Sequence, residues 1–152
     1  MRLSTRLVHP AWLLSVGLLA LAPAADAVPE SGITLGQITT RLEPRRSDLA
    51  RAFRQTVERE LARIDPKRIR SRERFVLSAA LMRLDTRSEA RRAQSTCVVS
   101  ATLSHARGGA LHAVIDGRAR AENSPTAVHQ AELTAMQAAV ESVFGRVPQA
   151  LK

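Results

Sequence analysis

Two alternating runs on either side of Arg107-Gly108-Gly109 restrict the fold more than any other feature of the chain. In residues 97–106 and in residues 110–121, apolar side chains fall mainly on odd positions. A period of two is typical of strands with one buried face, so the two runs predict a β-hairpin. Because paired residues share a face of the sheet, odd positions must pair with odd positions. A three-residue turn over 107–109 satisfies this by pairing Leu103 with Ala113, whereas a two-residue turn at the glycines sets apolar side chains against charged ones.

The same register predicts where the histidines of this hairpin lie. His105 falls on the inner face with the apolar positions, and His112 falls on the outer face. His129 lies apart, in a later segment. Because a metal ion in a protein needs converging ligands, we expect no metal site from these three side chains. The sequence also predicts no catalytic residues, no cofactor and no cofactor-binding residues.

Two segments have the spacing of amphipathic helices. Residues 47–64 begin with Ser47 as the expected N-cap and end at Asp65-Pro66. Residues 124–144 begin with Ser124 as the expected cap and end at Gly145 and Pro148. The second helix carries an apolar stripe that should cover the sheet: Leu133, Met136, Val140, Val143 and Val147, with Phe144 beside Val143.

Two further segments are strand candidates. Residues 33–42 are rich in β-branched side chains and are interrupted by Gly36. Residues 75–84 also suit a helix, but the short run and its Phe-Val-Leu start favour a strand. Residues 85–94 are expected to form a charged loop. The sequence therefore predicts an α+β fold, in the order β-α-β-β-β-α, with a four-stranded sheet and two helices on one face.

The first 27 residues have the pattern of a secretory signal peptide. Arg2 and Arg6 precede an uncharged apolar run over residues 11–22, and Ala25-Asp26-Ala27 follows as a cleavage site. The apolar run is shorter than the roughly 20 residues of a membrane-spanning helix, although a retained anchor is the alternative. We expect cleavage after Ala27, no transmembrane span in the mature form, and a single α+β domain over residues 28–152 in the periplasm or outside the cell. The expected first residue is Val28, so the cysteine of a bacterial lipoprotein is missing there.

The charge of the chain limits its partners. Lys and Arg total 23 against 14 Asp and Glu, which gives a net charge of +9. Basic chains bind nucleic acid, anionic lipid or acidic polysaccharide, although an excess of Arg over Lys also follows from GC-rich coding. Nucleic acid is a poor candidate for the partner, because the chain is expected to be exported and has no Tyr and few aromatic residues to stack on bases. The basic stretch Lys67–Arg74 is either a solvated connector or a contact for an acidic partner or an anionic envelope surface.

No known catalytic pattern is present in the sequence. It has no Gly-x-Ser-x-Gly motif, and Gly108-Gly109 lacks the Gly-Lys-Ser/Thr ending of a phosphate-binding loop. Cys97 opens an apolar strand face, which predicts a buried thiol, with a reactive thiol or an intermolecular disulfide as the alternative. We therefore expect a protein that is not an enzyme.

The pattern of strands and turns resembles a known periplasmic domain. The matching segments are Val98–Leu103, Gly108-Gly109 and Asp116–Ala119, between an earlier and a closing helix. This run is similar to the α/β domain of the curli-secretion lipoprotein family and to the amino-terminal domain of TolB. The resemblance covers about residues 33–147, and this chain lacks the lipid-anchor cysteine of the curli family. It implies the fold and a non-enzymatic envelope role, and it implies no site residues.

These observations lead to one main hypothesis about function and one alternative. The main hypothesis is a non-enzymatic exported binding or assembly module of the bacterial cell envelope, with envelope proteins as partners. The alternative is a secreted basic protein that binds an anionic polysaccharide or lipid surface. A hydrolase with an unrecognised site is a third reading, and the oligomeric state stays open.

Overall fold

The computed structural model describes residues 32–43, 46–69 and 71–152. The expected signal peptide over residues 1–27 lies outside the described residues. The division of the chain at residue 27 therefore stays a prediction.

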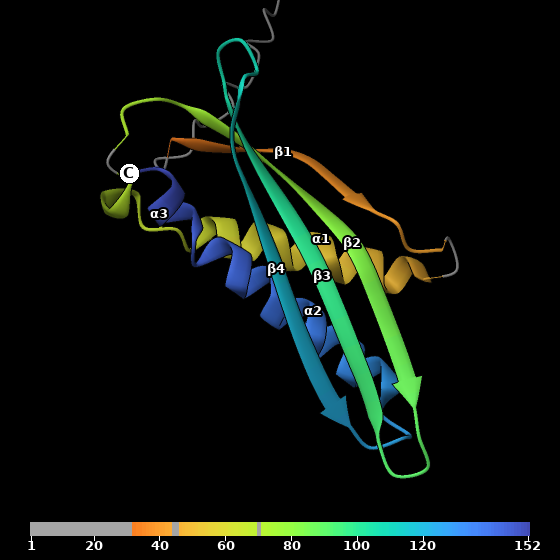
Figure 1. Cartoon of the computed structure of the whole chain (residues 1–152). Coiled ribbons are helices and arrows are strands. Elements are labelled where there is room, and N and C mark those ends of the chain that lie inside the picture. Colours follow the sequence, from red (N-terminus) through yellow and green to blue (C-terminus); the bar gives the residue numbers. More distant parts are fainter. Residues whose placement is uncertain (1–31, 44–45, 70) are drawn as a thin grey trace, which may run out of the picture.

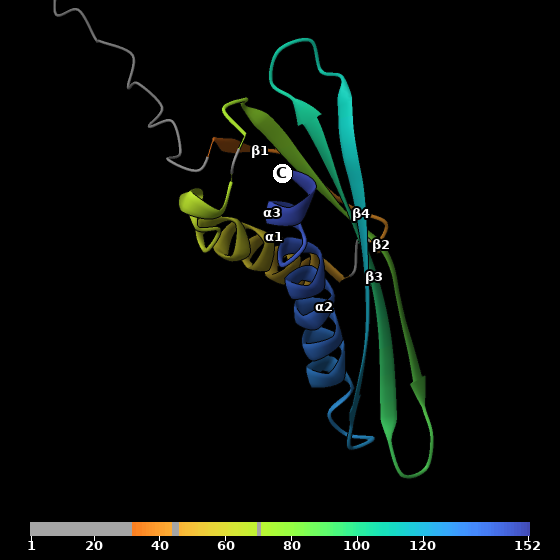
Figure 2. The ribbon, with the colours of Figure 1, turned by 60° about the vertical axis from the view of Figure 1, so that its left-hand side comes forward.

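The described residues form a four-stranded mixed sheet with helices on one face. The strands are β1 (Ile33–Thr40), β2 (Phe75–Ser88), β3 (Ala93–His105) and β4 (Leu111–Asn123), in the order β1-β2-β3-β4. β1 runs parallel to β2, and the other neighbours are antiparallel. The helices α1 (Ser47–Ala62) and α2 (Val128–Phe144) lie on the same side of the sheet, and no described segment covers the opposite face (Figures 1 and 2). Two short elements, η2 (Pro66–Arg68) and α3 (Val147–Ala150), complete this arrangement, which confirms the predicted α+β fold.

Residues 75–84 form a strand, as preferred from the sequence, but β2 is longer than predicted. The charged loop expected over residues 85–94 is wrong, because β2 continues to Ser88 and β3 begins at Ala93. A bulge between Leu81 and Arg83 shifts the alternation, so that Leu84 is buried while Arg83 is exposed. Charged residues fit this part of the strand because they alternate toward the uncovered face, where water solvates them.

The predicted hairpin register is confirmed along most of β3 and β4. Leu103 pairs with Ala113, Ala101 with Ile115 and Val99 with Gly117. The odd-numbered side chains of β3 are fully buried beneath the helices: Cys97, Val99, Ala101 and Leu103. The alternation in the sequence therefore identifies the buried face correctly.

The prediction for the turn end of the hairpin is wrong. Ser104 pairs with Leu111 while Leu103 pairs with Ala113, so His112 is an extra residue in a β-bulge. The connection consists of residues 106–110, and Gly108 and Gly109 adopt φ angles of 80° and 65°. A bulge redirects the side chain at the extra position. For this reason His112 is not separated from His105 as the alternation predicts, and their ring centroids lie 5.1 Å apart.

The helix starts differ from the sequence prediction by one to four residues. Ser47 is the first residue of α1, and no side chain caps that helix. Residues 124–127 form a turn closed by the hydrogen bond from Ala127 N–H to Ser124 C=O (3.0 Å), so α2 begins at Val128. Pro148 lies inside α3, whereas Gly145 does end α2.

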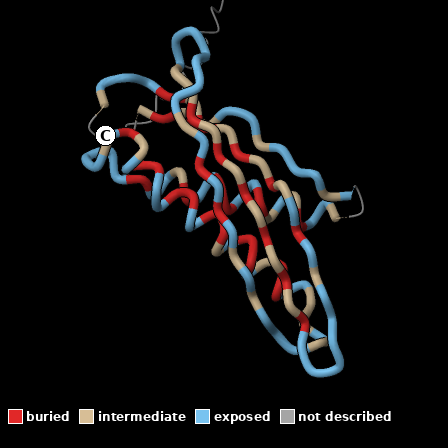
Figure 3. The backbone as a smooth tube through the Cα atoms, in the orientation of Figure 1, coloured by how far each residue is buried: buried red, intermediate tan, exposed pale blue. Residues whose placement is uncertain are grey.

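The predicted stripe of α2 forms the centre of the core. Its side chains are buried, apart from the partly buried Leu133: Met136, Val140, Val143 and Phe144 of α2, and Val147, which the structure places in α3. Small residues of the same helix, Ala135 and Ala139, are also fully buried. Figure 3 shows that the buried positions run along the inner side of both layers. The close approach of α2 to the sheet explains Gly117, which sits directly under the helix.

Candidate functional site

The connector before β2 and the turn between β3 and β4 lie together at one end of the sheet. The N–H of Ala106 donates a hydrogen bond to the C=O of Arg74 (2.8 Å), and Phe75 pairs with His105 in the ladder. A cavity of about 760 Å³ lies at this junction, and six residues line it: Arg72, Glu73, Arg74, His105, Ala106 and Arg107. We call this region the basic end.

The basic end carries positive charge that nearby carboxylates do not neutralise. Arg72, Arg74 and Arg107 are exposed, and none of them forms an ion pair within the part of the chain that the structure describes. The carboxylate of Glu73 contacts His105 instead, with Oε2 of Glu73 3.0 Å from Nδ1 of His105. Unpaired guanidinium groups present planar sets of donors that suit carboxylate or phosphate oxygens.

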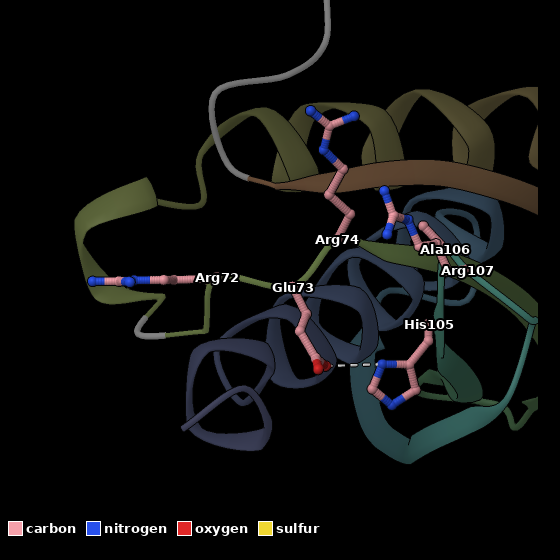
Figure 4. Close-up of a pocket in the computed structure, with 6 residues that line it drawn as sticks. All are labelled: Arg72, Glu73, Arg74, His105, Ala106 and Arg107. Carbon is pink, nitrogen blue, oxygen red and sulfur yellow. Dashed lines mark ion pairs between the residues drawn. The ribbon is translucent and has the colours of Figure 1, made fainter.

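The side chains of the basic end extend in different directions. In Figure 4, Glu73 and His105 turn toward each other, whereas Arg72 and Arg74 extend away from that pair and away from one another. A single small anion cannot contact all of these guanidinium groups at once. The arrangement suits a partner with several separated negative groups, such as a surface or a polymer.

An exposed apolar side chain follows the turn that carries Arg107. Leu111, which follows the turn between β3 and β4, is 63% exposed, and Val114 on the same strand is 54% exposed. They are the large hydrophobic side chains with high exposure in the described ranges. Cations beside an exposed apolar residue are typical of surfaces that contact an anionic lipid interface.

Three rings lie together where the basic end meets the core. The ring centroids of Phe75 and His105 are 5.2 Å apart, those of Phe75 and His112 are 4.8 Å apart, and those of His105 and His112 are 5.1 Å apart. Nε2 of His112 lies 2.9 Å from the C=O of Ala150, which ties β4 to α3. Sequence reasoning missed this cluster, because alternation alone placed the two histidines on opposite faces. From the sequence, this ring cluster could be found only by predicting a β-bulge beside the turn.

His129 takes no part in that cluster. It lies on α2, where its Nδ1 is 3.6 Å from Oδ2 of Asp48 and 4.0 Å from Oε2 of Glu132. Among the described residues, no group of three or more His, Cys, Asp or Glu side chains is arranged to hold a metal ion. None of the helices in the described ranges is long and apolar enough to cross a membrane.

Cys97 is buried in the core. Its side chain is fully inaccessible, and burial raises the pKa of the thiol from 9.0 to about 12. Because the thiolate is the reactive form, this thiol is unreactive at neutral pH. The structure therefore agrees with the buried-thiol interpretation rather than with a disulfide between chains.

Comparisons with known proteins identify the fold and no family. No known protein family and no curated protein sequence matches the chain. Hypothetical protein CT253 of Chlamydia trachomatis has a similar structure, with a TM-score of 0.52 and 12% identity over 78% of this chain and 96% of that one. At this identity the similarity shows a shared fold alone.

Two further solved structures are similar at a lower level. A lipoprotein candidate from Caulobacter crescentus has a TM-score of 0.49 and 17% identity, over 80% of this chain and 89% of that one. A minor lipoprotein from Acinetobacter baumannii has a TM-score of 0.43 and 8% identity, over 77% of this chain and 93% of that one.

Proposed function

We propose that this protein is a non-enzymatic binding module exported to the bacterial cell envelope, where its basic end contacts an anionic membrane surface. The observation that carries the proposal is the set of exposed arginines at the basic end, Arg72, Arg74 and Arg107, which form no ion pair among the described residues. The exposed Leu111 follows the turn that carries Arg107. The pattern of a signal peptide supports the export, and the resemblance to periplasmic domains supports the envelope role.

The expected strength of this contact follows from the number of charges. Each basic residue near an anionic lipid surface contributes about 1 kcal/mol. The three arginines of the basic end therefore supply roughly 3 kcal/mol, which corresponds to weak, reversible, peripheral binding. Because the attraction is between exposed charges, it weakens steeply as salt is added.

A vesicle-binding assay tests the proposal. The exported protein is mixed with vesicles that contain phosphatidylglycerol, or with vesicles of phosphatidylcholine alone, and the bound fraction is measured by sedimentation. We expect binding to the anionic vesicles at low salt only. Replacing three arginines with glutamine (Arg72→Gln, Arg74→Gln, Arg107→Gln) removes about 3 kcal/mol and weakens binding roughly a hundredfold.

A matched variant separates a local contact from net charge. The substitutions Arg51→Gln, Arg54→Gln and Arg91→Gln remove three exposed charges away from the basic end. We expect this variant to bind anionic vesicles within about threefold of the unchanged protein. Equal losses in both variants mean that the charge acts diffusely, and binding to a soluble anionic polysaccharide but not to vesicles favours the polymer instead. Either result rejects the membrane contact.

An assembly role is the second candidate, and it has its own supporting observation. β4 is a thirteen-residue strand at the edge of the sheet, with β3 as its partner on one side. The free edge of a long strand can pair with a strand from another protein. Cross-linking in intact cells from cysteines introduced along β4 tests this role, which predicts specific cross-linked products from that edge and none from the exposed side of α1.

A further inference from the structure

The two histidines that the bulge brings together have the arrangement of a metal-binding pair. We propose that His105 and His112 bind a divalent transition metal ion of the Zn²⁺ and Cu²⁺ class, with water completing the coordination. This inference is independent of the proposed membrane contact. It concerns the ring cluster, not the arginines.

The distance between the rings fits two ligands of one ion. With a metal–nitrogen bond of about 2.1 Å and a tetrahedral angle of about 109°, the centroids of two imidazole ligands lie roughly 5 Å apart. The centroids of His105 and His112 are 5.1 Å apart, with an angle of 87° between the ring planes. The two rings meet edge to edge or edge to face, and the spacing of their centroids matches that of two imidazoles on one ion.

The contacts of each ring leave one nitrogen free for a metal. Nδ1 of His105 faces the carboxylate of Glu73 at 3.0 Å, which favours a proton on Nδ1 and leaves the lone pair of Nε2. Nε2 of His112 lies 2.9 Å from the carbonyl oxygen of Ala150. Because a carbonyl oxygen only accepts hydrogen bonds, Nε2 carries the proton and the free lone pair of the ring is on Nδ1. Histidines that bind metals usually donate their second N–H to a carboxylate or a backbone carbonyl. His112 has such a carbonyl partner, and His105 has the carboxylate of Glu73 within ion-pair distance.

The surroundings of the pair support an ordered but accessible site. Phe75 is buried and contacts both rings, which limits their motion. His112 is exposed and the side chain of His105 is 30% exposed, so an ion reaches them from solvent. Glu73 supplies a negative charge next to His105, and Figure 4 shows that Arg72 and Arg74 point away from this contact. The arginines of the basic end lower the affinity for a cation, and the carboxylate of Glu73 opposes this effect next to His105.

The chemistry of the donors selects the class of metal. Two neutral imidazoles suit Zn²⁺, Cu²⁺ and Ni²⁺, whereas Mg²⁺ and Ca²⁺ prefer oxygen ligands. Because two protein ligands leave positions for water, we expect affinity in the micromolar range and stronger binding of Cu²⁺ than of Zn²⁺. Protons compete for the same nitrogens, so binding weakens as the pH falls.

Calorimetric titration tests the site. The exported protein is purified without a histidine tag, treated with a chelator, and titrated with ZnCl₂ and separately with CuSO₄. We expect one ion per chain. The variants His105→Gln and His112→Gln each weaken binding at least thirtyfold, and Glu73→Gln weakens it about tenfold through the second contact of His105. His129→Gln is the matched control and leaves binding unchanged within about twofold.

A second measurement keeps the test decisive if the variants lose their fold. In the unchanged protein, substoichiometric Cu²⁺ should broaden the NMR signals of the His105 and His112 rings while the signals of His129 stay sharp. Broadening of His129 alone overturns the proposal, as does Zn²⁺ binding weaker than about 1 mM or binding that survives the loss of both histidines. Because no vesicles are present, these results are independent of the membrane contact.

Discussion

Gly117 gives the sharpest test of how closely α2 packs on the sheet. A Cβ atom at this position lies 2.5 Å from the carbonyl oxygen of Ala139 and 2.6 Å from Cγ2 of Val143. The first of these atoms belongs to the helix backbone and cannot rotate away. Gly117→Ala therefore forces α2 away from β4.

The size of the effect follows from two opposing terms. Overpacking of a well-packed core lowers the free energy of unfolding by about 1–3 kcal/mol. Replacing glycine restricts the unfolded chain, which raises the free energy of unfolding by about 0.4–1 kcal/mol. We expect a net loss of about 1–2 kcal/mol in the free energy of unfolding. In a domain of this size, each kcal/mol lowers the melting temperature by roughly 3–6 °C.

Denaturation with guanidinium, followed by circular dichroism, measures this loss. The midpoint of Gly117→Ala should fall with an unchanged slope, because the change affects packing and not the area exposed on unfolding. Arg118→Ala is the matched control, since its side chain is exposed on the opposite face, and it should change stability by less than about 0.5 kcal/mol. In the Gly117→Ala background, Val143→Ala should cost less than it does alone, because it removes one of the two clashes.

A variant Gly117→Ala that is as stable as the unchanged protein refutes this reasoning. It would mean that a methyl group fits between β4 and α2. The packing of the second helix on the sheet, and the account of this glycine, would then be wrong.

Three further predictions concern the core, the thiol and processing. Phe144→Ala removes a buried ring of α2 that is 4% exposed and should cost about 3–5 kcal/mol in the free energy of unfolding, measured by the same titration. An unchanged stability would mean that the helix is not part of the core. The pKa of Cys97 is about 12 in the folded protein and 9.0 in the unfolded reference, so its contribution to stability is complete below pH 9 and is lost as the pH rises toward 12. A series of unfolding titrations over this range should show a decline that Cys97→Ala lacks. Mass spectrometry of the exported protein should give Val28 as its first residue, and an intact amino terminus on a membrane-bound product would contradict the signal peptide.

The sequence alone determined the layers of this protein and the buried face of most of the hairpin. Alternation over residues 97–106 and 110–121 identified the buried face, because a strand with one covered side must place apolar residues at every second position. The spacing from Leu49 to Ile64 and from Met136 to Val147 likewise identified the two helices. These patterns are local consequences of backbone geometry, so they can be read without knowing what packs on what.

The tertiary structure alone decided the two features that matter most for binding. The bulge at His112 depends on how β4 meets β3 beside the turn, and no residue type in that stretch signals it. It brings His112 next to His105 and Phe75, which are separate in sequence. The basic end likewise forms only when the connector before β2 meets the turn after β3. Contacts between distant segments depend on the whole packed arrangement, whereas periodicity reports only which side of its own element a residue occupies.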